Sequence, residues 1–241
     1  MSSPEVKKLK LNSEDASVIE EKDEKGPRPA FSSNHKITKD SSKYNLLIGV
    51  TGSVACIKLV ELLEQLKTTC MSDKLAIKIV TTDAALKLME TQNFNIEEII
   101  YEDRDEWSMW KGRGDLVLHI ELRKWADSML IAPLDANSMA KIALGLCDNL
   151  LTSVVRAWDP RKPLFYAPAM NTMMWDNPLT AQHRKTLKEL LRFKEIPPME
   201  KSLMCGDHGI GAMATVNMIS TIIAQDVKNK FSIYSQVRDN Y

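Results

Sequence analysis

The sequence predicts an α/β fold in which an open parallel sheet forms the middle of three layers, with helices on both faces. Several short runs are almost wholly apolar, as in residues 44–50 (YNLLIGV), and such runs are typical of strands buried on both faces. Segments with apolar residues at helical spacing alternate with these runs, which indicates repeated strand–helix units. Together these patterns predict the Rossmann/flavodoxin-like class.

The apolar runs predict four strands, at residues 44–50, 75–81, 128–133 and 164–168. In the segments between and after them, apolar residues recur at the spacing of one helix face. These segments predict a helix after the first strand and further helices at residues 137–144, 149–158, 180–191 and 216–230. Right-handed crossovers place the carboxyl ends of parallel strands along one edge, where ligands bind in folds of this class.

One domain is expected between two tails. Residues 1–43 are rich in Lys, Glu, Asp, Ser and Pro. Because they carry too little apolar area to offset the entropy of ordering, we predict a disordered tail there. The domain is expected at residues 44–231, and a short C-terminal tail at residues 232–241.

The composition argues against several classes of function. Lys and Arg total 32, as do Asp and Glu, so the net charge favours neither a nucleic acid nor a membrane as partner. The four cysteines form no CxxC pair, so no metal site is predicted, and reduced thiols favour a cytoplasmic location. The N-terminus shows no signal-peptide pattern, and no apolar run is long enough to span a membrane.

Three loops at the predicted sheet edge are built from small and hydroxyl-bearing residues, at positions 49–55, 81–83 and 132–138. A glycine at a strand–helix junction lets the backbone approach a ligand, and the helix N-terminus attracts phosphate. The first loop matches neither GxGxxG nor the P-loop pattern, so NAD and ATP are not indicated. The three loops together favour a mononucleotide pocket, although the first alone is equally compatible with a serine-capped turn.

Three further segments make the pattern specific: PxMNxxMW at residues 168–175, His119 within the run VLHIEL, and Cys205 in LMCGDHG. With the GVTGS and APLDANS loops, these motifs resemble the homo-oligomeric flavin-containing cysteine decarboxylases over roughly residues 44–218. The resemblance implies FMN held between the subunits of a homotrimer. It also implies the conversion of 4'-phosphopantothenoyl-L-cysteine to 4'-phosphopantetheine in coenzyme A biosynthesis.

The resemblance further implies which residues contact FMN, in the loops after the strands and in the segment at 152–156. At the phosphate and the ribityl chain it places Gly52, Ser53 and Val54, with Thr82 adding a contact. Near the ring it places Leu88, Pro133, Leu134, Ala136 and Asn137. The segment that completes the site consists of Thr152, Ser153, Val154, Val155 and Arg156.

The expected chemistry assigns roles to three residues. A carboxylate beside a saturated carbon leaves only if an electron sink is created, and hydride transfer from the thiol-bearing carbon to FMN creates one. His119 is the candidate base, Asn171 the candidate ligand of the substrate carboxylate, and Cys205 the candidate proton donor when the enethiol is reduced. Met173 and Met174 are expected to contact the substrate. Taken alone, each of the three could instead be structural: a packed histidine, a turn asparagine and an incidental thiol.

Two other functions within the same family remain open at this point. One is a regulatory subunit that inhibits a protein phosphatase, and the other is a decarboxylase of peptides that end in cysteine. The three candidate catalytic residues are all present, which favours the decarboxylase of coenzyme A biosynthesis over a regulator that has lost catalysis. The charged and aromatic residues 105–113 are either a subunit contact or a solvated surface loop.

Overall fold

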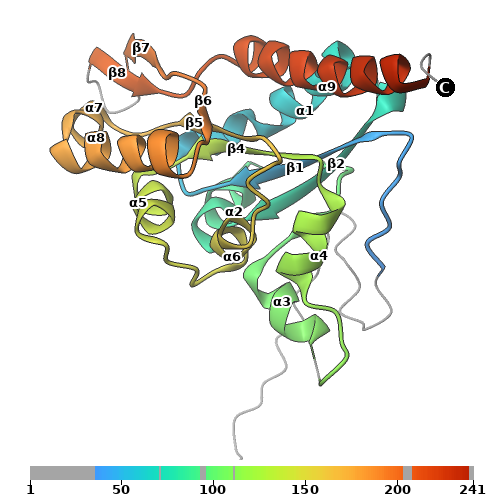
Figure 1. The fold of residues 1–241 in the computed structure, drawn as a ribbon. Helices are drawn as coiled ribbons and strands as arrows, with labels where there is room; N and C mark the ends of the chain where they lie inside the picture. Colours follow the sequence, from blue (N-terminus) through green and yellow to red (C-terminus); the bar gives the residue numbers. More distant parts are fainter. Residues whose placement is uncertain (1–35, 71, 93–95, 111, 203–207, 239–241) are drawn as a thin grey trace, which may run out of the picture.

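The structure is a computed structural model that describes residues 36–238 except for 71, 93–95, 111 and 203–207. Its centre is a six-stranded parallel sheet with the order β3-β2-β1-β4-β5-β6 (Figure 1). The strands are β1 (Tyr44–Val50), β2 (Leu75–Thr81), β3 (Ile100–Tyr101), β4 (Ser128–Leu134), β5 (Leu164–Pro168) and β6 (Lys194–Glu195). The order reverses between β1 and β4, which makes a topological switch point. The predicted fold class is confirmed.

Helices cover both faces of the sheet (Figure 1). On one face pack α1, which follows the short helix η1, together with α2 and α9. On the other face pack α3, α4, α5 and α6. The bounds of these helices are η1 Val54–Lys58, α1 Leu59–Thr69, α2 Asp83–Glu90, α3 Asp103–Met109, α4 Leu118–Trp125, α5 Ala136–Leu144, α6 Leu150–Arg156 and α9 Val216–Arg238.

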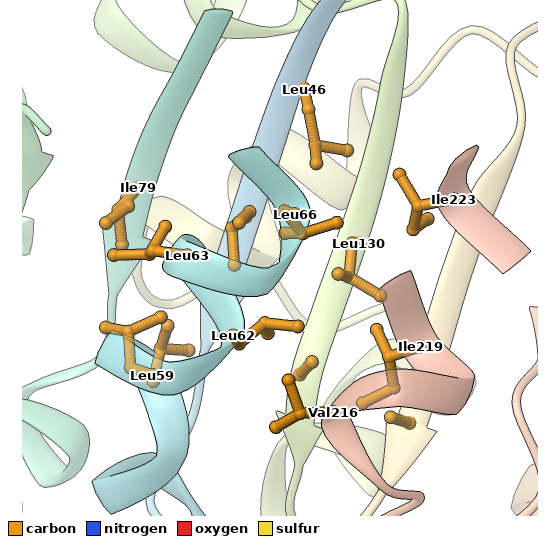
Figure 2. Packing of buried hydrophobic residues seen from close by; sticks show 14 of the residues in the cluster. Leu46, Leu59, Leu62, Leu63, Leu66, Ile79, Leu130, Val216, Ile219 and Ile223 are labelled. Carbon is orange, nitrogen blue, oxygen red and sulfur yellow. The ribbon is translucent and has the colours of Figure 1, made fainter. Parts of the chain in front are cut away.

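The strands are apolar throughout because successive side chains enter two different cores. In β1, Leu46 and Ile48 join the cluster under α1 and α9, whereas Leu47 joins the cluster on the opposite face. Figure 2 shows the first cluster, in which leucines of α1 and isoleucines of α9 lie over Leu46 and Leu130. Burying one such side chain contributes about 1.5–3 kcal/mol, so this two-sided packing is the main stabilisation of the sheet.

The segment after β5 adds smaller elements at one edge of the molecule. They are α7 (Thr172–Asp176), α8 (Pro178–Lys185), the π turn η3 (Thr186–Leu190) and an antiparallel hairpin of β7 (Met199–Ser202) and β8 (His208–Ala212). A single 3-10 turn, η2 (Ser72–Lys74), precedes β2. The sequence patterns did not predict β3, β6 or the hairpin.

The expected element bounds are largely confirmed for the long strands. β1, β2 and β5 have the predicted bounds, and β4 runs one residue further, to Leu134. The predicted helix end at residue 230 is wrong, because α9 continues to Arg238 and so crosses the expected start of the C-terminal tail. Part of the expected N-terminal tail also contacts the domain, since Ile37 packs against the core. The division into tails and domain stays a prediction.

Asp127 joins three parts of the chain that are distant in sequence. Its carboxylate accepts hydrogen bonds from Lys39 Nζ at 2.7 Å, Lys230 Nζ at 2.6 Å and the Asn45 backbone N–H at 2.9 Å. Burial alone would raise the pKa of Asp127, but the hydrogen bonds from Lys230, Lys39 and Asn45 outweigh it and lower the pKa to about 2. The carboxylate therefore fixes the segment before β1 and the helix α9 against the amino-terminal ends of β1 and β4.

We expect Asp127→Asn to lower the free energy of unfolding by about 1–2 kcal/mol, a value reduced for partial solvation of the group. Because folding lowers this pKa, the contribution is fully present above a pH of about 4 and is lost as the pH falls towards 2. Urea unfolding of both proteins between pH 7 and pH 3, at one protein concentration, tests this expectation. A difference in stability that stays constant over that range would contradict it.

Candidate active site

Three strand-end loops meet at the switch point between β1 and β4. Thr51 is fully buried there, and its hydroxyl donates to the carbonyl of Pro133 at 2.9 Å and accepts from the Asp135 N–H at 2.7 Å. The backbone N–H of Thr82 donates to the carbonyl of Val50 at 3.1 Å. The loops after β1, β2 and β4 are thus one connected structure, as the sequence predicted. The sequence pattern GVTGS does not by itself show that Thr51 joins these loops.

Gly52 lies where two of these loops touch. A Cβ atom added at Gly52 would come within 2.6 Å of the Ala84 Cβ in α2 and 3.4 Å of Asp135 Oδ2. The next residue, Ser53, caps η1 by accepting a hydrogen bond from the Ala55 N–H at 3.4 Å. The first residue of η1, Val54, is 47% exposed. Only glycine fits at position 52, and the loop keeps an open helix N-terminus beside it.

Two more helices begin at the same edge. The Thr82 hydroxyl accepts from the Ala85 N–H at the start of α2, at 3.3 Å. The Asp135 carboxylate accepts from the Ser138 N–H at the start of α5, at 2.8 Å. Helix N-termini carry partial positive charge, so the starts of η1, α2 and α5 together favour an anionic group such as a phosphate.

The remaining loop residues divide between the core and the surface. Pro133, which follows a cis peptide bond, and Leu134 are buried at the end of β4, and the Leu134 carbonyl accepts from the Ala169 N–H at 2.9 Å. Asn137 is exposed in the first turn of α5, and Ala136 is partly buried beside it. Leu88 packs partly buried against the α1 side of the core. The structure gives Leu88 a core contact, so its place near a cofactor ring stays a prediction.

Helix α6 carries the segment 152–156, and its residues also point in different directions. Thr152 is buried in a capping box, where its N–H donates to Asn149 Oδ1 at 2.8 Å. Val154 and Val155 are core residues as well. The exposed member is Arg156, which lines a cavity of about 220 Å³ between α5, α6 and η3, while Ser153 is partly exposed. Ser153 and Arg156 are therefore the two positions of the segment best placed for contacts outside the core.

His119 lies in the first turn of α4. Its Nδ1 lies 2.8 Å from Glu106 Oε1, and its backbone N–H donates to Glu106 Oε2 at 3.0 Å. Glu106 belongs to α3, which occupies part of the segment that the sequence suggested was a subunit contact or a loop. The histidine thus has a carboxylate partner that the sequence patterns missed. The structure forms a capping box at Glu102 and Asp105, but these residues do not match the Ser/Thr-x-x-Glu/Gln signature by which a sequence shows such a helix start.

Asn171 begins α7 as its N-cap, and its Oδ1 accepts from the Met173 N–H at 2.8 Å. This bond fixes the amide plane and makes the Nδ2 group the donor side. The neighbouring motif residues Met173 and Met174 are 73% and 54% exposed. Strand β8 supports the turn that contains Asn171, because the Met170 N–H donates to the Gly211 carbonyl in β8 at 2.9 Å.

The end of the motif is held by a charged cluster. The Arg184 guanidinium stacks over the Trp175 ring, 4.1 Å from its centre. Arg184 in turn forms two hydrogen bonds to Glu195, at 2.8 and 2.7 Å, and Tyr166 donates to the same carboxylate at 3.0 Å. The cluster fixes α7 and α8 against β5 and β6.

His119 and Asn171 stand on different helices of the chain. Figure 1 shows α4, the helix of His119, beside α3 at the lower right, and α7, the helix that Asn171 caps, beside β8 at the upper left. Cys205, between β7 and β8, lies outside the described residues. The roles assigned to these residues stay predictions.

Two absences hold for the part of the chain that the structure describes. No three residues among its His, Cys, Asp and Glu side chains gather as a metal site would require. None of its helices has both the length and the apolar character needed to cross a bilayer. A cytoplasmic location stays a prediction.

Comparison with known proteins identifies what this arrangement resembles. The family model described as Flavoprotein matches residues 34–228. Phosphopantothenoylcysteine decarboxylase of Mus musculus is 49% identical over 195 residues, which cover 81% of this chain and 90% of the mouse protein. The solved structure of a PPC decarboxylase mutant complexed with pantothenoylaminoethenethiol has a TM-score of 0.71 and 46% identity, and covers 77% of this chain and 99% of that one. The FMN binding protein AtHal3 has a TM-score of 0.69 and 46% identity, with coverages of 78% and 98%.

The support of the Asn171 turn by β8 gives a prediction for Gly211. A Cβ atom at this position would lie 2.5 Å from the backbone oxygen of Met170, and its φ of +145° is strained for any other residue. We expect Gly211→Ala to lower the free energy of unfolding by about 1–3 kcal/mol in urea titrations.

The matched control is Gly112→Ala, because a Cβ atom there meets no atom within 4 Å. If the two variants are equally stable, the close contact between β8 and the Asn171 turn does not exist as described.

Proposed function

This chain belongs to the flavoprotein family, and we propose that it is the FMN-dependent enzyme that converts 4'-phosphopantothenoyl-L-cysteine to 4'-phosphopantetheine in coenzyme A biosynthesis. The observation that carries the proposal is the 49% identity to the mouse decarboxylase over 90% of that protein. His119, Asn171 and Cys205, the residues that this reaction requires by family resemblance, all stand in the matched region.

The strand-end loops fit the cofactor. The contact of Gly52 with α2 leaves a side-chain-free backbone before η1, where the Ser53 hydroxyl and the Val54 N–H would hold the FMN phosphate. The apolar residues Pro133, Leu134 and Ala136, together with Asn137, would line the flat ring. Bound FMN supplies a two-electron acceptor for the carbon that carries the substrate thiol.

His119 is proposed to accept the proton of the substrate thiol. Its Nδ1 is engaged by Glu106 at 2.8 Å, so its Nε2 is the atom that would take this proton. Imidazole suits the role because one ring nitrogen can accept a proton while the other donates a hydrogen bond. The residue therefore prepares the thiol for oxidation of its neighbouring carbon.

Asn171 is proposed to orient the carboxylate that leaves. Its cap bond to Met173 fixes the amide, and the amide N–H groups can donate to a carboxylate without placing a full positive charge beside it. A lysine or arginine would stabilise the ground-state carboxylate more and so raise the barrier to its loss. The exposed side chains of Met173 and Met174 would contact the rest of the substrate.

Cys205 is proposed to donate a proton when the enethiol left after decarboxylation is reduced to the saturated product. The solved relative that holds pantothenoylaminoethenethiol supports a reaction that passes through such a species. This step returns the two electrons to the substrate, so the net reaction only releases carbon dioxide.

A homotrimer with FMN between its subunits is proposed because α4 and α7 lie on different sides of the chain (Figure 1). Each side carries large apolar residues exposed to solvent: Trp107 at 75% on α3, and Met173 at 73% on α7. Contacts between copies would cover these side chains and bring the His119 of one subunit to the Asn171 of another. The same contacts would place Arg156 beside a neighbouring chain.

The activity is tested with purified protein that is incubated anaerobically with phosphopantothenoylcysteine. We expect a flavin absorption spectrum, release of carbon dioxide, and a product with the mass of 4'-phosphopantetheine. His119→Asn is expected to reduce decarboxylation by about 10²- to 10⁴-fold, the usual contribution of a general base, with the flavin spectrum retained. A colourless wild-type protein would contradict the proposed reaction, and a fully active His119→Asn variant would contradict the assigned base.

An active site formed by residues of two subunits leads to a second prediction. When His119→Asn and Asn171→Ala chains carrying different tags are co-expressed, mixed oligomers should regain activity although each variant alone has almost none. If each site takes one residue from each of two neighbours in a ring, about a quarter of the sites are intact at equal mixing. Recovery of about that fraction supports the trimer with shared sites. Mixed oligomers without activity would place both residues of a site on one chain.

A further inference from the structure

We propose that Glu106 is a positioning residue for the reaction, which fixes the ring orientation and the tautomer of His119. This inference rests on the proposed role of His119 as the base. Both carboxylate oxygens of Glu106 contact His119. Oε1 lies 2.8 Å from the ring Nδ1, and Oε2 accepts the backbone N–H of His119 at 3.0 Å. The side chain of His119 is 26% exposed and that of Glu106 is 16% exposed, so water competes only weakly for this contact.

The chemistry of the pair determines where the ring proton lies. An ionised carboxylate can only accept hydrogen bonds, so His119 Nδ1 must carry the hydrogen in the contact with Glu106. In the neutral ring the lone pair then stays on Nε2, which faces away from the carboxylate. The second bond, to the backbone, ties the carboxylate to the start of α4 and so limits rotation of the ring.

The carboxylate is itself held in a fixed place. Helix α3 starts with a capping box, in which Asp105 Oδ2 accepts the Glu102 N–H at 2.8 Å. Asp103, one turn before Glu106, accepts the N–H of Leu150 at 2.7 Å, at the first residue of α6. Helix α3 therefore links the helix of the base to the segment proposed to complete the cofactor site.

The substitution Glu106→Gln tests the role. A glutamine has one carbonyl oxygen for two donors, and its NH2 group can face Nδ1 and stabilise the other tautomer. We expect kcat to fall by about 10²-fold or more, within the range for loss of a general base, while KM changes by less than about threefold. The flavin spectrum and the melting temperature of the loaded enzyme should stay close to wild type.

The matched control is Glu121→Gln. Glu121 lies on the same helix as His119, and its carboxylate bonds Lys124 at 2.8 Å, so the variant removes one negative charge from α4 without touching the ring. Its kcat should stay within about twofold of wild type. Equal losses in the two variants would overturn the proposal, since the effect would then be one of charge and not of orientation.

The tautomer can be read directly by nitrogen NMR of the wild-type holoenzyme labelled with ¹⁵N-histidine. The His119 signals are those missing from the His119→Asn spectrum. We expect a protonated Nδ1 and an unprotonated Nε2, and the reverse pattern would overturn the proposal even if Glu106→Gln fails to fold. An inactive His119→Asn enzyme combined with a normal Glu106→Gln enzyme defeats this inference alone, whereas an active His119→Asn enzyme defeats the proposed base itself.

Discussion

The parallel pairing of β1 with both β2 and β4 is the constraint on which the rest of the structure depends. It places the carboxyl ends of these strands side by side, and the reversal of strand order leaves a gap between the loops that follow. The Thr51 hydroxyl closes the floor of that gap by bonding both Pro133 and Asp135. Three helices then start around one point, and a site for a phosphate-bearing cofactor follows from the topology.

The fold could be predicted from the sequence to the extent that its forces are local or periodic. The strands β1, β2 and β5 were found with their bounds because a strand buried on both faces is apolar at every position. β3 and β6 were missed because each has two residues, too few for any periodicity. The end of α9 was missed although Phe231, Ile233, Tyr234 and Val237 continue the three- and four-residue spacing of a helix beyond residue 230.

The candidate site, too, could be predicted only where its features are local in sequence. The glycine-serine loop and the PxMNxxMW motif could be recognised because they are contiguous in sequence. The orientation of single side chains could not, as α6 shows: Val154 is buried in the core while Arg156 is exposed. The partner of His119 could not be found either, since Glu106 stands 13 positions earlier in a segment whose charges resemble an ordinary surface. Only the packing of α3 beside α4 reveals that contact.

The Asp127 cluster has a practical consequence for producing the protein. Lys39 donates to this carboxylate from a segment that precedes the first strand, and Lys230 donates to it from the last helix. A shortened gene designed from the strand boundaries alone would begin at Tyr44 and would discard one of the two cations. Expression and crystallisation trials should therefore cut upstream of Ile37, so that Lys39 and Lys230 both still reach Asp127.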